Sequence, residues 1–447
     1  MKLIQGNPDA AVSTTSSGLA GQAMHEISPQ EAESHEVHRR SMGSSSGIVR
    51  WLLRQVLAAC GNPAIRLMLW DGQTIESSPG SSPGSSPGTP VGDVVIRDRA
   101  TLRHLLVDAN VAFGDGYSEG TIEIRGSLVD VLSEICAAAE RASGGGLLRR
   151  FLHRPRRRRQ HSLATSRDSV HHHYDIGNDF YSLWLDERMQ YTCAYFAEPA
   201  FTLEQAQLAK LDHVCRKLQL KSGESVVEAG CGWGGLALHM AERYGVSVRA
   251  FNLSREQIAY ARELARSRGL ARSVEFVEDD YRNVTGEYDA FVSVGMLEHV
   301  GLENYGELGR VIDRSLLPSG RGLLHSIGRN VAAPIDPWTD KRIFPGAYPP
   351  SLREMLEVLE PARLSVLDVE NLRLHYARTL EGWLERFERA ADKVARMFDE
   401  RFVRMWRMYL ACSIAAFRVG ELQLFQVVFA RASNNNIPWT RNHLYEK

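Results

Sequence analysis

Short hydrophobic runs alternate with helical patterns through residues 225–327, and this alternation predicts a parallel β-sheet with helices on both faces. Long helical patterns follow at 352–359 and 380–417, and the apolar runs 364–369 and 422–430 predict an antiparallel hairpin that completes the sheet. The individual strands are predicted at 225–229, 246–251, 274–277, 290–294 and 322–327. The predicted fold class is therefore α/β, a doubly wound Rossmann-like sheet with a C-terminal antiparallel hairpin.

A smaller set of elements precedes this region. A helical pattern begins at Ile48, and the later pattern at 102–107 lies among strand-like runs at 65–69, 94–96 and 121–124. We predict a small N-terminal α+β module at 47–145, a basic linker at 146–168, a catalytic domain at 169–432 and a tail at 433–447. The Ser-Ser-Pro-Gly repeats within 77–90 predict a flexible surface insertion, and the Ser- and Gly-rich residues 1–46 predict a disordered tail.

Composition narrows the class of protein only slightly. Lys plus Arg number 53 and Asp plus Glu 54, so net charge gives no argument for a nucleic-acid partner. The six cysteines form no C-x-x-C pair, which predicts free thiols in a reducing compartment. No segment has the apolar core of a signal peptide or the roughly 20 apolar residues of a membrane span, so we expect a cytoplasmic protein.

One basic segment stands apart from this balanced charge. Seven arginines lie between Arg149 and Arg159, and Leu148, Phe151 and Leu152 are interleaved with them. Arginines gain about 1 kcal/mol each near an anionic bilayer, and apolar side chains can enter the headgroup layer. Peripheral contact with the inner membrane surface and a merely solvated linker both remain open interpretations.

A glycine-rich turn is the strongest candidate for a ligand site. Gly230, Gly232 and Gly235 have the spacing G-x-G-x-x-G between a hydrophobic run and a helical pattern, as in dinucleotide sites. Glu228 would repel a pyrophosphate, and strand 246–251 is not followed by the acid that a ribose usually requires. S-adenosylmethionine carries an ammonium and a sulfonium that a carboxylate attracts, so we favour this methyl donor. A turn that only lets helix and strand pack closely is the remaining alternative.

Polar side chains follow the next two strands, where ligands of such sheets bind. They are Asn252, Ser254 and Gln257 after the second strand, with the apolar Leu253 among them as a further candidate, and Asp280 and Tyr281 after the third. Asn252 and Gln257 are suited to ribose hydroxyls, and Ser254 to capping the next helix. Asp280 and Tyr281 are suited to the amino group and the face of adenine.

The fourth and fifth strands carry acid and base groups. Glu298 and His299 follow the fourth strand, and His325 lies inside the fifth. A metal site is the less favoured interpretation, because Glu298 and His299 are adjacent, point apart and lack a third ligand at regular spacing. Proton transfer at the mouth of the donor pocket fits a carboxylate and a histidine better.

Several stretches together resemble one known family. They are HHHYDIGNDFY at 171–181, MQYTCAYF at 189–196, VVEAGCGWGG at 226–235, FVSVGMLEHVG at 291–301, LLHSIG at 323–328 and LQLFQVVFAR at 422–431. In this order and spacing they resemble the cyclopropane-fatty-acyl-phospholipid synthases, methyltransferases that use S-adenosylmethionine. The resemblance runs from about Ile48 to Arg431 and excludes both tails and the Ser-Ser-Pro-Gly repeats.

This resemblance implies transfer of a methylene from S-adenosylmethionine to a cis double bond of a phospholipid acyl chain. It implies bicarbonate as the base, held by Cys193, Glu298, His325, Ile327 and Tyr376. It places the donor against Tyr191 and Thr192, against the turn residues Gly230, Cys231, Gly232 and Gly234, and against the residues named above after the second and third strands, Leu253 included. Cys412 falls where the family has a cysteine sometimes proposed as catalytic, but alkene methylation needs no thiol and we favour packing.

Competing functions remain open at this point. One is a methyltransferase of the same fold that leaves a methyl or methylene branch on the fatty acid, or methylates a small molecule. Another is a silent lipid-binding protein, which the chemically competent residues at every donor and base position disfavour. The expected partner is unsaturated phospholipid at the membrane surface, and a homodimer is compatible with this interpretation.

Overall fold

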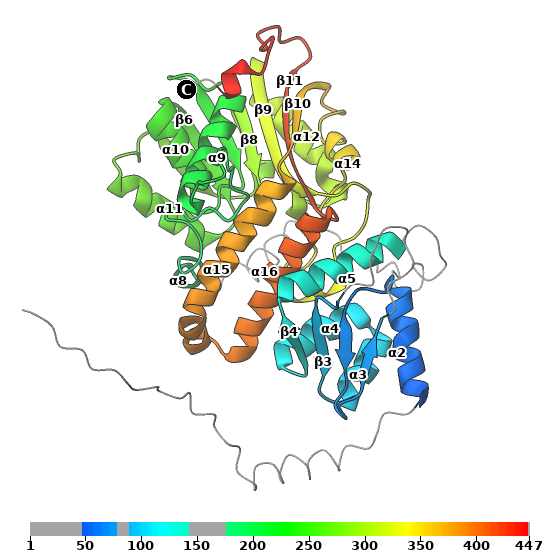
Figure 1. Cartoon of the computed structure of the whole chain (residues 1–447). Coiled ribbons are helices and arrows are strands. Elements are labelled where there is room, and N and C mark those ends of the chain that lie inside the picture. Colours follow the sequence, from blue (N-terminus) through cyan, green and yellow to red (C-terminus); the bar gives the residue numbers. More distant parts are fainter. Residues whose placement is uncertain (1–46, 78–88, 143–175, 446–447) are drawn as a thin grey trace, which may run out of the picture. The chain divides into compact units, whose positions relative to one another are not determined.

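The computed structural model describes residues 47–77, 89–142 and 176–445 (Figure 1). The predictions for the N-terminal tail, for most of the Ser-Ser-Pro-Gly insertion and for the basic linker therefore lie outside the described residues. So do His171 to Asp175 of the HHHYDIGNDFY stretch.

A seven-stranded sheet forms the larger part of the chain. Its spatial order is β10-β11-β9-β8-β5-β6-β7, in which β5 to β9 run parallel and β11 pairs antiparallel with both β9 and β10. The strands are β5 (Ser225–Ala229), β6 (Ser247–Asn252), β7 (Val274–Glu278), β8 (Tyr288–Val294), β9 (Leu316–Gly328), β10 (Leu364–Asn371) and β11 (Gln423–Arg431). The predicted doubly wound sheet and its C-terminal hairpin are confirmed.

Helices cover both faces of this sheet, because its central strands are buried on both sides and need two apolar layers. Helix α9 (Leu203–Lys217) precedes the first strand, and the helices that follow between strands are α10 (Gly235–Tyr244), α11 (Arg255–Ser267), α12 (Tyr305–Ser315), α13 (Pro337–Arg342) and α14 (Leu352–Leu356). Two separate clusters of buried side chains result, one containing Val226 and Ile258 and the other Val227 and Leu308.

The predicted single helical stretch at 380–417 is wrong. The chain instead forms two helices, α15 (Arg373–Met397) and α16 (Glu400–Val419), which pack side by side (Figure 1). The break comes at Asp399, whose side chain accepts a hydrogen bond from the backbone N–H of Phe402 at 2.7 Å and so begins a new helix. The pair buries large aromatic side chains, among them Trp383 and Trp406.

The N-terminal module is α+β as predicted. Its sheet has the order β2-β1-β3-β4, with β1 (Arg66–Met68), β2 (Thr74–Glu76), β3 (Gly92–Ile96) and β4 (Ile122–Gly126). Its helices are α2 (Gly47–Ala59), α3 (Arg99–Val107), α4 (Ala109–Glu119) and α5 (Leu128–Ala142). We did not predict α4, because Gly114 and Gly116 lie inside it. A Cβ at Gly114 would lie 2.4 Å from Nε1 of Trp338, so close packing requires that glycine.

The module and the larger part share contacts within the unit 45–447. Arg342 of α13 forms a bidentate ion pair with Asp115 of α4, at 2.9 and 2.7 Å. The predicted tail at 433–447 also packs as far as it is described, since Leu444 is buried and Arg441 pairs with Asp368 of β10. None of the helices in the described ranges combines the length and the apolar composition needed to span a bilayer.

Candidate active site

The glycine turn connects β5 to α10 as predicted. Gly230, Gly232 and Gly234 all have positive φ, at 83°, 53° and 81°, which L-residues rarely adopt. A Cβ at Gly234 would lie 2.5 Å from the ring of Phe276. The backbone N–H groups of Gly230 and Cys231 both donate to the carbonyl of Phe251, at 2.9 and 3.0 Å, which ties the turn to the end of β6.

Glu228 lies buried at the end of β5, only 2% exposed. Its Oε2 has no hydrogen-bond partner among the described residues. Burial raises the pKa of Glu228 to about 8, against the opposing charge of Lys210. A buried carboxyl with one unpaired oxygen is costly, so a cationic ligand at this turn would stabilise its charged form. The predicted attraction between Glu228 and S-adenosylmethionine fits this environment.

Lys210 of α9 is a component of the site that we did not predict from the sequence. It is fully buried, and its Nζ donates to Oε1 of Gln190 at 2.5 Å and to Oγ1 of Thr192 at 3.0 Å. Burial lowers the pKa of Lys210 to about 8. Lys210 thus positions the segment containing Tyr191 and Thr192. A lysine on the apolar face of α9 was the available signal.

The predicted donor residues after β6 form a connected group. Asn252 donates from Nδ2 to the carbonyl of Gly232 at 3.2 Å and to Oε1 of Gln257 at 2.7 Å. Ser254 caps α11, as predicted, by accepting from the backbone N–H of Gln257. Nε2 of Gln257 is buried without a partner among the described residues, which leaves a donor for a ligand hydroxyl. Leu253 connects these residues.

The predicted donor residues after β7 and before α9 make contacts with other residues of the protein that we did not predict. Asp280 accepts from the backbone N–H of Arg282 at 2.9 Å and caps a short 3-10 helix, and Arg282 lies over the Tyr281 ring at 5.3 Å. The hydroxyl of Tyr191 is 2.8 Å from that of Tyr409 on α16. These contacts support the local backbone, and the adenine contact of Asp280 and Tyr281 stays a prediction.

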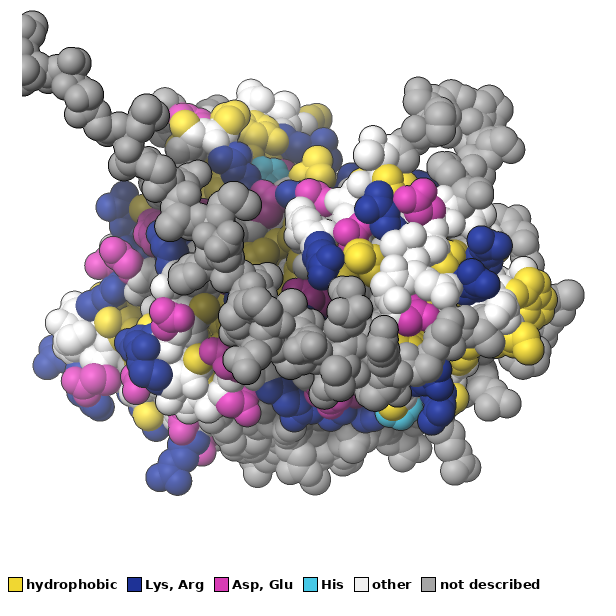
Figure 2. All heavy atoms as spheres, turned by 60° about the horizontal axis from the view of Figure 1, so that its bottom comes forward, with side chains coloured by type: hydrophobic (Ala, Val, Ile, Leu, Met, Phe, Trp, Pro, Cys, Tyr) yellow, Lys and Arg dark blue, Asp and Glu magenta, His cyan; other side chains and the backbone are white. Residues whose placement is uncertain are grey.

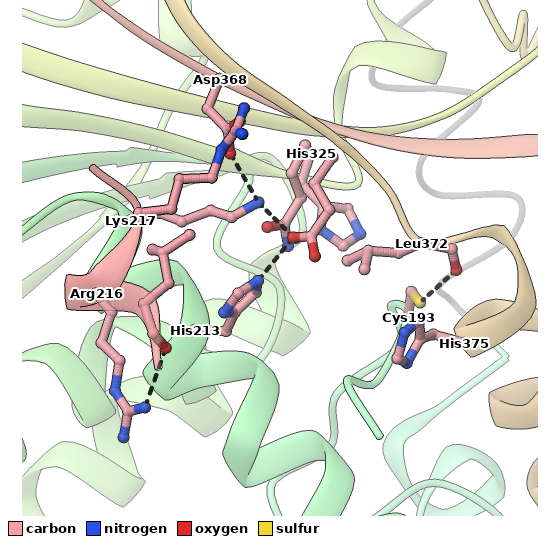
Figure 3. Close-up of polar contacts among 12 residues, drawn as sticks. Cys193, His213, Arg216, Lys217, His325, Asp368, Leu372 and His375 are labelled. Carbon is pink, nitrogen blue, oxygen red and sulfur yellow. Dashed lines mark hydrogen bonds and ion pairs between the residues drawn. The ribbon is translucent and has the colours of Figure 1, made fainter. Parts of the chain in front are cut away.

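The five residues predicted to hold bicarbonate come from four separate segments that meet around Leu372. Ile327 of β9 is in register with Leu424 of β11, whose carbonyl accepts from the backbone N–H of Leu372 at 2.8 Å. The carbonyl of Leu372 accepts from the backbone N–H of Tyr376 at 3.1 Å and faces Sγ of Cys193 at 3.9 Å (Figure 3). The chain thus brings Cys193, Ile327 and Tyr376 to one place.

Glu298 completes this group from the segment after β8. Its Oε1 accepts from the backbone N–H of Ile327 at 2.5 Å, while its Oε2 is buried without a partner among the described residues. Burial raises the pKa of Glu298 to about 7, so both ionisation states are accessible near neutral pH. The neighbouring His299 packs near Phe344 instead. No cluster of three potential metal ligands occurs in the described ranges.

His325 of β9 is fully enclosed. Its Nδ1 lies 3.0 Å from Nε2 of Gln426 on β11, and its own Nε2 has no partner among the described residues. Burial, with the charges of Lys210 and Lys217, holds the pKa of His325 well below its usual range. The ring is therefore neutral near pH 7 and is better suited to donating a hydrogen bond than to storing a proton.

The two candidate thiols lie in different parts of the chain, but burial raises the pKa of both. Cys193 is buried beside Leu372, and burial raises its pKa far above the usual value. Cys412 lies on α16 with Sγ 3.5 Å from Sδ of Met408 one turn earlier, and burial raises its pKa as well. Neither is a reactive thiolate, and the contacts of Cys412 fit the packing role that we favoured.

Comparison with solved structures identifies the class of protein. The mycolic acid cyclopropane synthase CmaA1, in complex with S-adenosylhomocysteine and CTAB, superposes with a TM-score of 0.56 at 29% sequence identity, covering 59% of this chain and 97% of that one. With the glycine turn and the buried Glu228, this defines an S-adenosylmethionine-dependent methyltransferase of the Rossmann-like fold.

The family follows from the sequence comparisons. A family model described as mycolic acid cyclopropane synthetase matches residues 161–427, and this chain belongs to that family. The cyclopropane-fatty-acyl-phospholipid synthase of Escherichia coli strain K12 is 46% identical over 59% of this chain and 68% of its own length. A probable fatty acid methyltransferase of Pseudomonas putida is 34% identical over 85% of this chain and 96% of its own. A domain of unknown function matches residues 52–143.

A change at Glu228 tests the charge argument for the donor. Glu228→Gln should weaken S-adenosylmethionine by about 10-fold, and should weaken S-adenosylhomocysteine less, because only the former carries the sulfonium charge. Titration calorimetry measures both. An equal loss for the two ligands would show that only the ammonium interacts with Glu228, and no loss for either would contradict the role of Glu228.

The raised pKa of Glu228 predicts that the affinity for S-adenosylmethionine depends on pH. Because Glu228 has a pKa of about 8 without ligand, affinity for S-adenosylmethionine should rise with pH up to about 8 and then level off. Lys210 loses its charge in the same range, which acts in the same direction. Glu228→Gln should flatten the profile. A slope that persists in this variant would assign the titration to Lys210.

Proposed function

We propose that this protein transfers a methyl group from S-adenosylmethionine to the cis double bond of an unsaturated phospholipid acyl chain and then closes a cyclopropane ring, with bicarbonate as the base. One observation carries the proposal. Oε2 of Glu298 and Nε2 of His325 are buried polar atoms without a partner among the described residues, and Oε1 of Glu298 accepts from the backbone N–H of Ile327, two residues after His325 on β9. Buried polar groups are normally paired, so these two atoms indicate a small polar ligand.

Bicarbonate fits this set of groups. Nε2–H of His325 and the hydroxyl of Tyr376 are donors for an anion, and Glu298 can donate when protonated or accept when ionised. Bound there, bicarbonate would supply a weakly nucleophilic base that takes a proton without being alkylated. The protonated thiol of Cys193 is likewise a poor nucleophile towards a cation.

The chemistry explains why the remaining walls are apolar. The alkene π electrons form a bond to the donor methyl carbon while the carbon–sulfur bond breaks and its electrons stay on sulfur. Loss of one proton from the new methyl group then lets the C–H electrons close the ring. Water would trap the intermediate cation, and the buried aromatic residues of this part of the core, including Tyr181, Trp184 and Trp383, exclude it. Aromatic faces also stabilise positive charge.

Bicarbonate dependence tests the proposal. In carbonate-depleted buffer, with S-adenosylmethionine and vesicles of unsaturated phospholipid, ring formation should be slow, and added bicarbonate should restore it. The ring product is measured by gas chromatography of the lipid extract. A rate of ring formation that does not respond to bicarbonate would contradict the assignment of the base.

A second candidate function has its own support. The Pseudomonas putida relative, which covers most of this chain, is named a probable fatty acid methyltransferase. An enzyme of that kind would use the same donor site and leave a methyl or methylene branch. The two candidates share the first bond-forming step and differ in which proton leaves, so only the structure of the product separates them.

Peripheral contact with the membrane is part of the proposal, because the acyl chains lie in a bilayer. On the face shown in Figure 2, basic and acidic side chains are interspersed with hydrophobic ones. Attraction to anionic lipid is assigned to the seven arginines between Arg149 and Arg159, which lie outside the described residues. Two apolar side chains of α2, Ile48 and Trp51, are exposed and could enter the headgroup layer.

Vesicle sedimentation tests this contact. Binding to anionic vesicles should be strong at low ionic strength and weaken as salt shortens the screening length to about 10 Å at 0.1 M. Replacing Arg156, Arg157, Arg158 and Arg159 with serine should reduce low-salt binding, while neutral vesicles serve as the control. Unchanged low-salt binding of the variant would show that the segment is only a linker.

A further inference from the structure

A row of three polar side chains crosses the antiparallel edge of the sheet behind the proposed bicarbonate site. Gln426 of β11 is in direct register with His325 of β9 on one side and with Glu370 of β10 on the other. Directly opposed residues point to the same face of a sheet, with Cβ atoms about 5 Å apart. His325, Gln426 and Glu370 are thus neighbours on one face.

Each end of this row is fixed by hydrogen bonds. Nε2 of Gln426, a side chain with no exposed surface, lies 3.0 Å from Nδ1 of His325. At the other end, Oε2 of Glu370 accepts from Nζ of Lys217 at 2.6 Å and pairs with Nε2 of His213 at 2.7 Å (Figure 3). Both partners of Glu370 come from α9, so α9 holds this part of the sheet in place.

The contact at Gln426 determines where His325 carries its proton. In the structure the amide nitrogen of Gln426 faces Nδ1 of His325 while its Oε1 has no partner among the described residues, and with the amide in this orientation Nδ1 is the acceptor. A neutral imidazole has one N–H group, and with Nδ1 as acceptor that group is on Nε2. Nε2 is the buried atom without a partner among the described residues. An N–H group there suits an anion, whereas a lone pair would repel it.

We propose that Gln426 is a positioning residue that holds His325 in the tautomer protonated on Nε2, and that it thereby supplies the hydrogen-bond donor for bicarbonate. The proposal rests on the proposed function for the identity of the anion. The position of the proton on His325 follows from the orientation of the Gln426 amide and does not depend on the identity of the anion. Gln426 itself need not touch any reacting atom.

Nuclear magnetic resonance of the protein labelled with nitrogen-15 in histidine reads the tautomer directly. The signals of His325 are assigned by their loss in His325→Asn. The unmutated protein should show His325 protonated on Nε2. In Gln426→Glu an ionised carboxylate accepts from Nδ1–H, so the proton should move to Nδ1. In Gln426→Leu the constraint is absent, and both tautomers should be populated.

Kinetics provide the second measurement. At saturating S-adenosylmethionine, the KM for bicarbonate should rise about 10- to 100-fold in Gln426→Glu, while the dissociation constant of S-adenosylmethionine stays unchanged. Gln423→Leu is the matched control, a buried glutamine of the same strand that bonds Asn371 and the carbonyl of Gly420 instead. It should leave both the tautomer and the KM for bicarbonate unchanged.

Two results would overturn the proposal. One is His325 protonated on Nδ1 in the unmutated protein, and the other is an Nε2–H tautomer that persists in both Gln426 variants with an unchanged KM for bicarbonate. The tautomer is measured without turnover, so the role of Gln426 in fixing it can be tested even if bicarbonate is not the base. A missing response of the unmutated enzyme to bicarbonate would instead contradict the proposed function.

Discussion

Replacing Glu298 with glutamine should slow ring formation by about 100- to 10,000-fold, the usual contribution of a positioned acid or base group. Glutamine keeps an oxygen that can accept from the backbone N–H of Ile327, so the local fold should survive. It places an NH₂ group where Oε2 was, which cannot ionise or exchange a proton. The loss should therefore fall on deprotonation after methyl transfer, and not on donor binding.

The products of Glu298→Gln should show where the intermediate cation goes when its base is impaired. We expect traces of methyl-branched unsaturated lipid or of hydrated lipid beside little ring product. The dissociation constant of S-adenosylmethionine should be unchanged, and the exposed Glu360→Gln serves as the surface control. Ring formation within about threefold of the unmutated rate would show that the carboxyl group of Glu298 is not part of the base machinery.

Gly234→Ala should lower the free energy of unfolding by about 2 to 5 kcal/mol and abolish tight donor binding. An L-residue in the left-handed conformation costs about 1–2 kcal/mol, and Gly234 has φ of 81°. Overpacking adds about 1–3 kcal/mol, because the new Cβ would lie 2.5 Å from the Phe276 ring and 2.9 Å from Cβ of Ala261. The turn would have to move away from the strand ends.

A neighbouring glycine separates backbone strain from the clash. Gly232 also has positive φ, 53°, but a Cβ there meets no atom within 4 Å. Gly232→Ala should therefore cost only the conformational part, about 1–2 kcal/mol. Denaturant unfolding of the two variants, with calorimetry of S-adenosylmethionine, measures both effects. Equal destabilisation would show that the contact with Phe276 is not what requires a glycine at 234.

The strands were predictable because burial on both faces leaves a plain signature. The runs that became β5 and β8 are nearly continuous in apolar residues, and the glycines after β5 mark the ligand turn. The break between α15 and α16 was missed although Asp399 followed by a helical pattern is a recognisable cap. The helical periodicity is strong both before and after Asp399, so the sequence suggested one continuous helix.

The candidate site was predictable residue by residue but not as an assembly. The resemblance named Cys193, Glu298 and His325, yet no sequence pattern shows that Leu372 contacts Cys193 and Tyr376 through its carbonyl and β11 through its N–H group. Lys210 and Gln426 were missed for another reason. Each is a polar residue in an otherwise apolar position, and its role depends on partners more than 15 residues away in sequence.

The proposed reaction leaves a cyclopropane ring in the acyl chain. The most direct test incubates the unmutated protein with vesicles of cis-unsaturated phospholipid and S-adenosylmethionine labelled with carbon-13 in the methyl group, then records the NMR spectrum of the extracted lipid. We expect the label in a ring CH₂ bonded to both former alkene carbons. Label found only in methyl or methylene branches, with no ring CH₂, would contradict it and establish the branching methyltransferase.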